Sequence, residues 1–207
     1  MEKLVKVSEL VSGQKVVPVV VIENEEQAMA MPQALLDGGV NVIEITLRHP
    51  YALEAIELIK KEFPQMVIMA GTVCTADQMR ASVDVGAGSI VSPGITNRLL
   101  TTAQELNIPY LPGVATASDI LQAVEFGLNE CKLFPATVVG GISALKALGG
   151  PFGDISFCPT GGVNASNYQD FLALPNVMFV GGSWLAPSKL VAAGDWQGIT
   201  QLANAIA

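Results

Sequence analysis

Residues 40–48 read Val40-Asn41-Val42-Ile43-Glu44-Ile45-Thr46-Leu47-Arg48, a β-branched run between two amphipathic segments, residues 25–37 and 51–63. The β-branched residues predict a strand, and the apolar periodicity of the two flanking segments predicts helices. The same unit of strand, turn and helix returns about every 20 to 26 residues along the chain. The predicted strands begin near Val16, Val40, Met66, Gly88, Ile108, Glu130, Ile155 and Val177.

Eight strand–helix units in 207 residues favour an α/β protein built as a TIM (β/α)8 barrel, near the lower size limit of that fold. The alternative is a doubly wound open sheet, which would carry a glycine-rich first turn. Here the first turn reads Ile22-Glu23-Asn24-Glu25, without a glycine. No linker or low-complexity tract divides the chain, so the sequence predicts one barrel domain over residues 1–207.

Polar and glycine residues mark several predicted helix ends. Thr75 and Thr96 stand where N-caps are expected, and either Thr116 or Ser118 is expected to cap the following segment. Gly86 is expected to end the helix that Thr75 begins. Prolines lie inside two of the strand-like runs and leave the boundaries of those strands open: Pro109 and Pro112 in the fifth run and Pro159 in the seventh.

The composition excludes several classes of protein. Half of the residues are hydrophobic and 14% are charged, which excludes a disordered chain. The formal net charge is −8, and no basic block is present, so neither a nucleic acid nor a membrane surface is a predicted partner. The apolar runs are shorter than the ~18 residues of a membrane-spanning helix. An anionic ligand must therefore be held by local groups, because the overall field repels it.

The few cysteine and histidine residues limit the chemistry further. Cys74, Cys131 and Cys158 are odd in number and lack metal-ligand spacing, which predicts free thiols in a reducing compartment. The first residues lack the apolar core of a signal peptide, so we expect a cytoplasmic protein. His49 is the only histidine, which excludes a multi-histidine metal site, and its position before Pro50 predicts a loop.

Charged residues occur within the strand predicted over residues 40–48. The two-residue period of a strand places Glu44, Thr46 and Arg48 on one face, toward the barrel interior. Buried charges are costly unless they are paired. Glu44 and Arg48 therefore form either a structural ion pair or a site with an acid/base carboxylate and an anion-binding guanidinium.

The sixth strand-like run, residues 130–136, contains Lys132. Among the lysines of the chain, this is the one that lies within an apolar strand. Burial among apolar groups favours the neutral amine, which attacks carbonyls to form a Schiff base. The alternative role is a structural bridge to Glu44, and the two roles are compatible.

Glycines gather where the later strands are expected to end. The motifs Pro159-Thr160-Gly161-Gly162 and Gly181-Gly182-Ser183-Trp184 follow the seventh and eighth strands, where barrel enzymes bind phosphate through backbone N–H groups and a short helix N-terminus. Earlier strands end in Ala70-Gly71-Thr72-Val73, Ser92-Pro93-Gly94 and Leu111-Pro112-Gly113. Their glycines either admit a ligand close to the backbone or serve ordinary turns.

Taken in order, these motifs resemble the 2-keto-3-deoxy-6-phosphogluconate (KDPG) aldolases, which often also cleave 2-keto-4-hydroxyglutarate (KHG). The resemblance extends over nearly the whole chain. It rests on the motifs above together with Val17-Pro18-Val19-Val20, Gly38-Gly39-Val40 and Lys132-Leu133-Phe134-Pro135-Ala136. It implies a carbon–carbon lyase of the Schiff-base type, without metal or cofactor, that acts in the Entner–Doudoroff pathway and forms homotrimers.

The resemblance also assigns residues. Lys132 would form the Schiff base, and Glu44 would carry protons. The substrate-binding residues would be Arg48 and Thr72 for the carboxylate of the pyruvate moiety, Pro93 and Phe134 for the pocket walls, and Thr160, Gly161, Gly162, Gly182 and Ser183 around the phosphate. The chain departs from the common family pattern at Leu133 and Met69, both of which are expected to face outward.

The implied reaction splits KDPG into pyruvate and glyceraldehyde 3-phosphate, and KHG into pyruvate and glyoxylate. An aldolase for the 6-phosphogalactonate epimer is an open alternative, because a C4 epimer shares every anchor named above. A metal-dependent aldolase would need a ligand cluster that the sequence does not offer. Another small phosphate-binding barrel, such as an isomerase or a thiamine phosphate synthase-like enzyme, and a non-catalytic barrel would leave Lys132 and Glu44 without a role.

Overall fold

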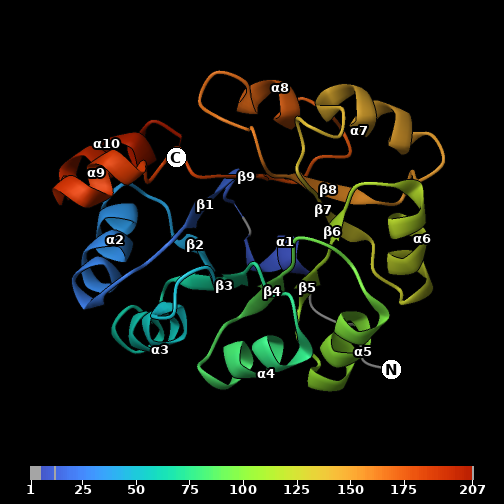
Figure 1. Ribbon diagram of the computed structural model, residues 1–207. Helices are drawn as coiled ribbons and strands as arrows, with labels where there is room; N and C mark the ends of the chain where they lie inside the picture. Colours follow the sequence, from blue (N-terminus) through green and yellow to red (C-terminus); the bar gives the residue numbers. More distant parts are fainter. Residues whose placement is uncertain (1–5, 12, 207) are drawn as a thin grey trace.

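Parallel strands form a ring that helices surround in the computed structural model, which describes residues 6–11 and 13–206 (Figure 1). The strands over these residues are β1 (Val16–Val20), β2 (Val42–Thr46), β3 (Val67–Gly71), β4 (Ser89–Val91), β5 (Tyr110–Leu111), β6 (Gly113–Val114), β7 (Glu130–Leu133), β8 (Ser156–Pro159) and β9 (Val180–Gly182). The helices are α1 (Val7–Leu10), α2 (Glu25–Asp37), α3 (Ala52–Glu62), α4 (Ala76–Asp84), α5 (Asn97–Leu106), α6 (Ala117–Glu125), α7 (Gly141–Gly149), α8 (Tyr168–Leu172), α9 (Ser188–Ala193) and α10 (Trp196–Asn204).

The strand pairing confirms the barrel. One parallel sheet has the order β5-β4-β3-β2-β1-β9, and a second has the order β6-β7-β8. The fifth predicted strand joins the two sheets, because β5 and β6 are its two halves, separated by Pro112. Proline has no N–H for the ladder, yet its carbonyl still accepts the Lys132 N–H at 2.8 Å. Bridges between Phe157 and Val177 and between Thr160 and Gly181 close the ring at β8 and β9.

The predicted helix boundaries hold where local capping sets them. The segment over residues 25–37 is α2, and the side chain of Asn24 caps its first turn. Thr75 and Thr116 each form a capping box. The threonine side chain accepts the backbone N–H of the residue three positions later, and the side chain of that residue accepts the backbone N–H of the threonine. Thr116 rather than Ser118 is therefore the cap of α6. None of the helices in the described residues is long and apolar enough to cross a membrane.

Register determines which side chains point into the barrel. Glu44 pairs with Met69, and Met69 with Ser89, so these three side chains share one face. That face is the interior, because Glu44 reaches Lys132 on the far strand β7. The expectation that Met69 faces outward is wrong: its side chain is 1% exposed and lies in the interior row. Leu133 alternates with Lys132 and faces outward, as predicted.

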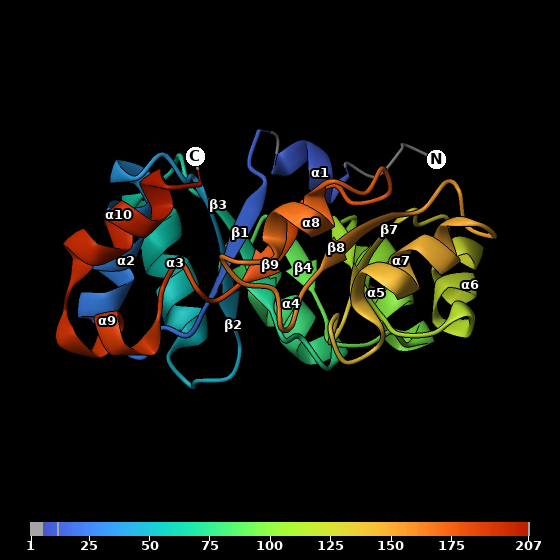
Figure 2. The same ribbon diagram turned by 90° about the horizontal axis from the view of Figure 1, so that it is seen from above.

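Helix α1 covers the end of the barrel at which the strands begin (Figure 2). The Ser8 N–H donates to Glu130 Oε2 at 3.1 Å, and the Ser8 hydroxyl donates to the other carboxylate oxygen. Glu130 is the first residue of β7, two positions before Lys132. The loops at the opposite end of the barrel, where the strands end, carry the predicted site residues.

We predict that the substitution Thr75→Ala lowers the free energy of unfolding by about 1 kcal/mol, because it removes the side chain that accepts the Gln78 N–H. Chemical denaturation monitored by circular dichroism measures this loss. Thr101→Ala is the matched control, since Thr101 is an exposed threonine within α5. A loss of the same size in the control would show that Thr75 does not act as a cap.

Candidate active site

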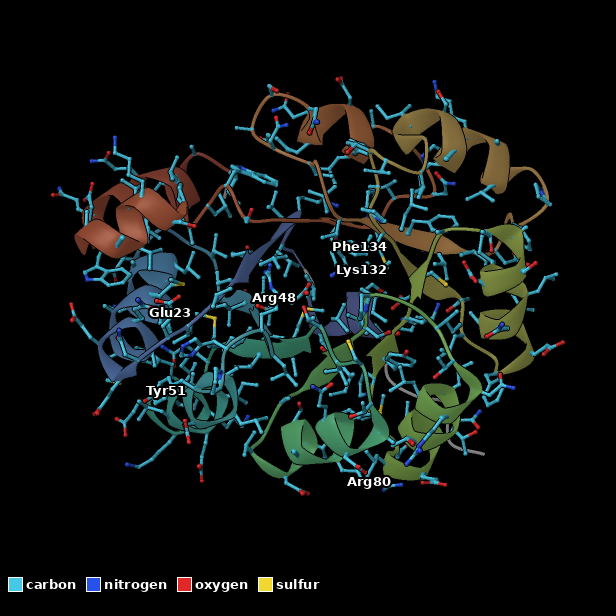
Figure 3. All side chains as sticks on the ribbon, in the orientation of Figure 1. Glu23, Arg48, Tyr51, Arg80, Lys132 and Phe134 are labelled. Carbon is cyan, nitrogen blue, oxygen red and sulfur yellow. The ribbon has the colours of Figure 1, made fainter. Side chains whose placement is uncertain are left out.

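The site centres on a buried ion pair between strands that are not neighbours. Lys132 Nζ on β7 lies 3.0 Å from Glu44 Oε1 and 3.4 Å from Glu44 Oε2 on β2. The two side chains are only 6% and 3% exposed. Figure 3 shows Lys132 inside the ring of strands, between the ribbons rather than among the outer helices. The sequence-predicted catalytic pair therefore meets in space, although 88 residues separate the two positions.

Apolar and neutral groups surround this pair. The Phe134 ring centroid lies 5.4 Å from Lys132 Nζ, within the range in which a ring face attracts a cation. Cys158 pairs in register with Lys132 and lies on the same inner face. Burial raises the pKa of the Cys158 thiol to about 12, so the thiol is neutral at physiological pH. Because the Cys158 thiol is neutral, it does not replace Glu44 as the anion that pairs with the Lys132 ammonium.

Gly71, the last residue of β3, makes room for the Glu44 carboxylate. A Cβ atom at this position would overlap Glu44 Oε1 and crowd its Cγ and carboxyl carbon. The glycine predicted to admit a ligand close to the backbone thus leaves space for the Glu44 side chain.

Thr72 follows directly in the left-handed region, with a φ of +59°. This conformation is rare for a β-branched residue and costs on the order of 1–3 kcal/mol, a strain typical of functional sites. Pro93 lies at the end of the next strand, where its backbone packs so closely on Gly113 that any side chain at 113 would overlap it. The predicted substrate-binding residues of β3 and β4 therefore lie at the same end of the barrel.

Arg48 lies beyond its strand rather than within it. Strand β2 ends at Thr46, and Arg48 occupies the turn that follows, at the barrel mouth. Its Nε donates to Thr46 Oγ1 at 3.1 Å, and the Thr46 hydroxyl donates to the Val20 carbonyl at 2.9 Å. This chain of bonds orients the guanidinium from its Nε side. Neither terminal nitrogen bonds to any of the described residues, so both are available to a ligand.

Arg48 and Ser183 line one pocket of about 350 Å³, although they belong to the loops after β2 and β9. Glu23 and Gln27, from the loop after β1 and the start of α2, also line it. Nothing in the sequence marks these two residues as ligand-binding, because polar side chains are ordinary where a helix begins. Only the packing of α2 and α9 around β1 brings them to the pocket.

The two glycine motifs expose backbone N–H groups. Gly161 and Gly162 have φ values of +94° and +78°, and the Gly162 carbonyl accepts the side-chain amides of Asn164 at 3.3 Å and Asn167 at 3.1 Å. With that carbonyl held, the Gly162 N–H donates to no atom of the described residues, and neither does the Ser183 N–H.

Within the described residues, no helix begins directly after either glycine pair. Helix α8 begins at Tyr168 and α9 at Ser188, both several residues after the glycine pairs. The amide donors therefore belong to the turns themselves, and Thr160 packs its hydroxyl against Gly181 between them. Across the part of the chain that the structure describes, no group of three or more His, Cys, Asp or Glu side chains could hold a metal ion.

Comparisons with known proteins identify the family of the chain. The family model described as KDPG and KHG aldolase matches residues 7–202. The KHG/KDPG aldolase of Escherichia coli K12 is 46% identical, with 91% of this chain and 89% of the relative covered. The 2-dehydro-3-deoxy-phosphogluconate aldolase of Dickeya dadantii is 47% identical, with 95% and 92% covered.

A solved structure is similar over the same length. The KDPG aldolase of Legionella pneumophila, which holds pyruvate as a covalent carbinolamine, superimposes with a TM-score of 0.94. It is 43% identical, and the alignment covers 97% of each chain. The family match, the identity of the relatives and the shared barrel together show that this chain belongs to the KDPG and KHG aldolase family.

Proposed function

We propose that the chain is a Schiff-base aldolase that cleaves KDPG to pyruvate and glyceraldehyde 3-phosphate, and also KHG to pyruvate and glyoxylate. The observation that carries this proposal is the buried pair of Lys132 and Glu44 at 3.0 Å. The relatives named for KDPG cleavage support the choice of substrate. The covalent pyruvate adduct of the Legionella pneumophila enzyme supports the Schiff base.

The pair supplies both the nucleophile and the proton carrier. Glu44 accepts a proton from the Lys132 ammonium, and the free amine attacks the C2 ketone of the substrate. Glu44 returns the proton to the departing hydroxyl, so water leaves and an iminium remains. The ionised Glu44 then takes the proton of the C4 hydroxyl while the C3–C4 bond breaks into the iminium. The aldehyde leaves as the enamine forms.

The second half of the cycle reverses these roles. The protonated Glu44 donates to C3 of the enamine, which restores the iminium of pyruvate. Water adds to that iminium, pyruvate departs, and Lys132 is regenerated. No step needs a metal or cofactor, because the iminium itself accepts the electron pair of the broken bond.

The remaining predicted residues bind the substrate. In the proposal, Arg48 and Thr72 hold the carboxylate next to C2, and Phe134 and Pro93 exclude water from the reacting atoms. The Thr160–Gly162 turn, Gly182 and Ser183 hold the phosphate with backbone N–H groups and hydroxyls. This suits a chain of net charge −8, because amide dipoles attract an anion without a basic patch.

We further propose that the enzyme is a single-domain homotrimer of the cytoplasm. The free thiols of Cys74, Cys131 and Cys158 fit a reducing compartment. Exposed apolar side chains, Leu121 and Val124 on α6, fit a covered subunit surface. The mass of the native protein in solution decides the number of subunits.

We expect borohydride to trap pyruvate on Lys132 of the wild-type protein, and Lys132→Ala to abolish the adduct. Glu44→Gln should retain an imine but slow turnover by roughly 10²–10⁴-fold, because it removes the proton carrier. Intact-mass and peptide mass spectrometry locate the adduct, and pyruvate release measures turnover. An adduct that persists in Lys132→Ala, or near-normal turnover in Glu44→Gln, would contradict these roles.

Gly71→Ala should slow turnover by roughly 10-fold or more, because its methyl group displaces the Glu44 carboxylate from Lys132. Steady-state cleavage of KDPG measures the effect. Gly88→Ala is the matched control, since a Cβ there meets only the Ile68 carbonyl at an ordinary 3.5 Å. Equal activity of the two variants would refute the steric role of Gly71.

Ser183→Ala should mainly raise KM for KDPG, by roughly 10-fold, the usual effect of losing one hydrogen bond to a charged group. Cleavage of KHG, which has no phosphate, should change little. Parallel kinetics on the two substrates make the comparison. If both substrates suffer equally, Ser183 is not a phosphate ligand.

A further inference from the structure

The side chain of Trp184 fills the space behind the second glycine motif. Gly181 shares the inward face with Thr160, so Gly182 faces outward, toward the helices. A Cβ at position 182 would overlap the six-membered ring of Trp184. The indole therefore lies against the end of β9, next to the turn that presents Ser183.

The same ring contacts the loop that follows β8. The Trp184 and Tyr168 ring centroids are 5.7 Å apart at an interplanar angle of 36°, a separation typical of attractive aromatic pairs. Tyr168 begins α8, and its backbone N–H donates to the Asn164 carbonyl at 3.0 Å. Asn164 in turn bonds the Gly162 carbonyl. A short chain of contacts thus links the indole to the Gly161-Gly162 turn.

From this geometry we infer that Trp184 is a positioning residue that sets the separation between the free N–H groups of Gly162 and Ser183. The inference rests on the proposed function, in which an anionic phosphate is bound between those two turns. Amide dipoles act only at short range and in the right direction, unlike the point charge of a lysine. Because the binding relies on dipoles, small displacements of either turn weaken it steeply.

The partial exposure of the ring favours this role over simple core filling. Trp184 and Tyr168 are both partly exposed, and they lie at the margin of the apolar cluster that contains Val163, Leu185 and Phe171. A residue that only filled the core would be buried by that cluster. Trp184 instead links the turn after β9, through the ring of Tyr168 and the bonds of Asn164, to the Gly161-Gly162 turn after β8.

The test compares Trp184→Leu, Trp184→Phe and the control Trp196→Leu in the full-length protein. Trp196 is a partly buried tryptophan on α10, and it packs against a different apolar cluster from the one that Trp184 and Tyr168 contact. Trp184→Leu should raise KM for KDPG by roughly 10- to 100-fold, the scale of a misplaced binding group. KHG cleavage and borohydride trapping of pyruvate should stay near the wild-type level. Trp184→Phe, which keeps an aromatic ring against Tyr168, should restore most of the affinity.

Equal losses on KDPG and KHG in Trp184→Leu, or the same KDPG defect in Trp196→Leu, would overturn the inference in favour of a purely structural role. Wild-type protein that traps pyruvate yet fails to cleave KDPG would instead contradict the proposed substrate, so the two failures are distinguishable.

A second measurement needs neither turnover nor the leucine variant. In a Trp196→Phe background, Trp184 is the remaining tryptophan of the two in the chain. Titration with inorganic phosphate should shift its fluorescence, and adding Ser183→Ala should weaken the response. A fluorescence signal that does not change with phosphate would refute the coupling between Trp184 and the anion.

Discussion

The buried ion pair between Lys132 and Glu44 is the interaction on which the surrounding structure depends. Two opposite charges removed from water persist only when they are well matched, and loss of one partner typically costs roughly 3–5 kcal/mol. The surrounding structure meets that condition. Gly71 leaves space for the carboxylate, Phe134 offers a ring near the ammonium, and Cys158 stays neutral because burial raises its thiol pKa to about 12. The closed ring of strands keeps the charges in contact.

The barrel carries two kinds of polar group, charged side chains in its interior and backbone N–H groups at its mouth. In the proposed reaction, Glu44 on β2 and Lys132 on β7 exchange a proton as full charges, and both side chains are deeply buried. The turns after β8 and β9 offer backbone N–H groups, which attract an anion without adding a charge to the interior. Arg48, in the turn after β2, shares a pocket with Ser183, in the turn after β9. A substrate with a carboxylate at one end and a phosphate at the other matches this division.

Much of the fold could be predicted from short stretches of the sequence. Helix α2, the caps at Thr75, Thr96 and Thr116, and the alternation of strands and helices follow from neighbours along the chain. The sequence indicated the strand register less clearly than it indicated the helices and their caps. Strand β3 is apolar on both faces, so nothing in its composition shows that Met69 points inward; its pairing with Glu44 settles that. Pro112 left the boundaries of the fifth strand open, and the sequence did not indicate that the segments on both sides of it would belong to the ring.

The sequence by itself determined which residues could carry charge into the interior, because a lysine and a glutamate within apolar strands are too costly to bury unless they pair or take part in chemistry. It also determined where backbone could be exposed, because paired glycines permit conformations that other residues avoid. Only the tertiary structure decided which of these groups meet. Lys132 and Glu44 are 88 positions apart, and the residues of the pocket come from the turn after β2 (Arg48), the turn after β9 (Ser183), the loop after β1 (Glu23) and the first turn of α2 (Gln27). Their contact depends on closing the ring and on strand register, and both are properties of long-range pairing rather than of any local pattern.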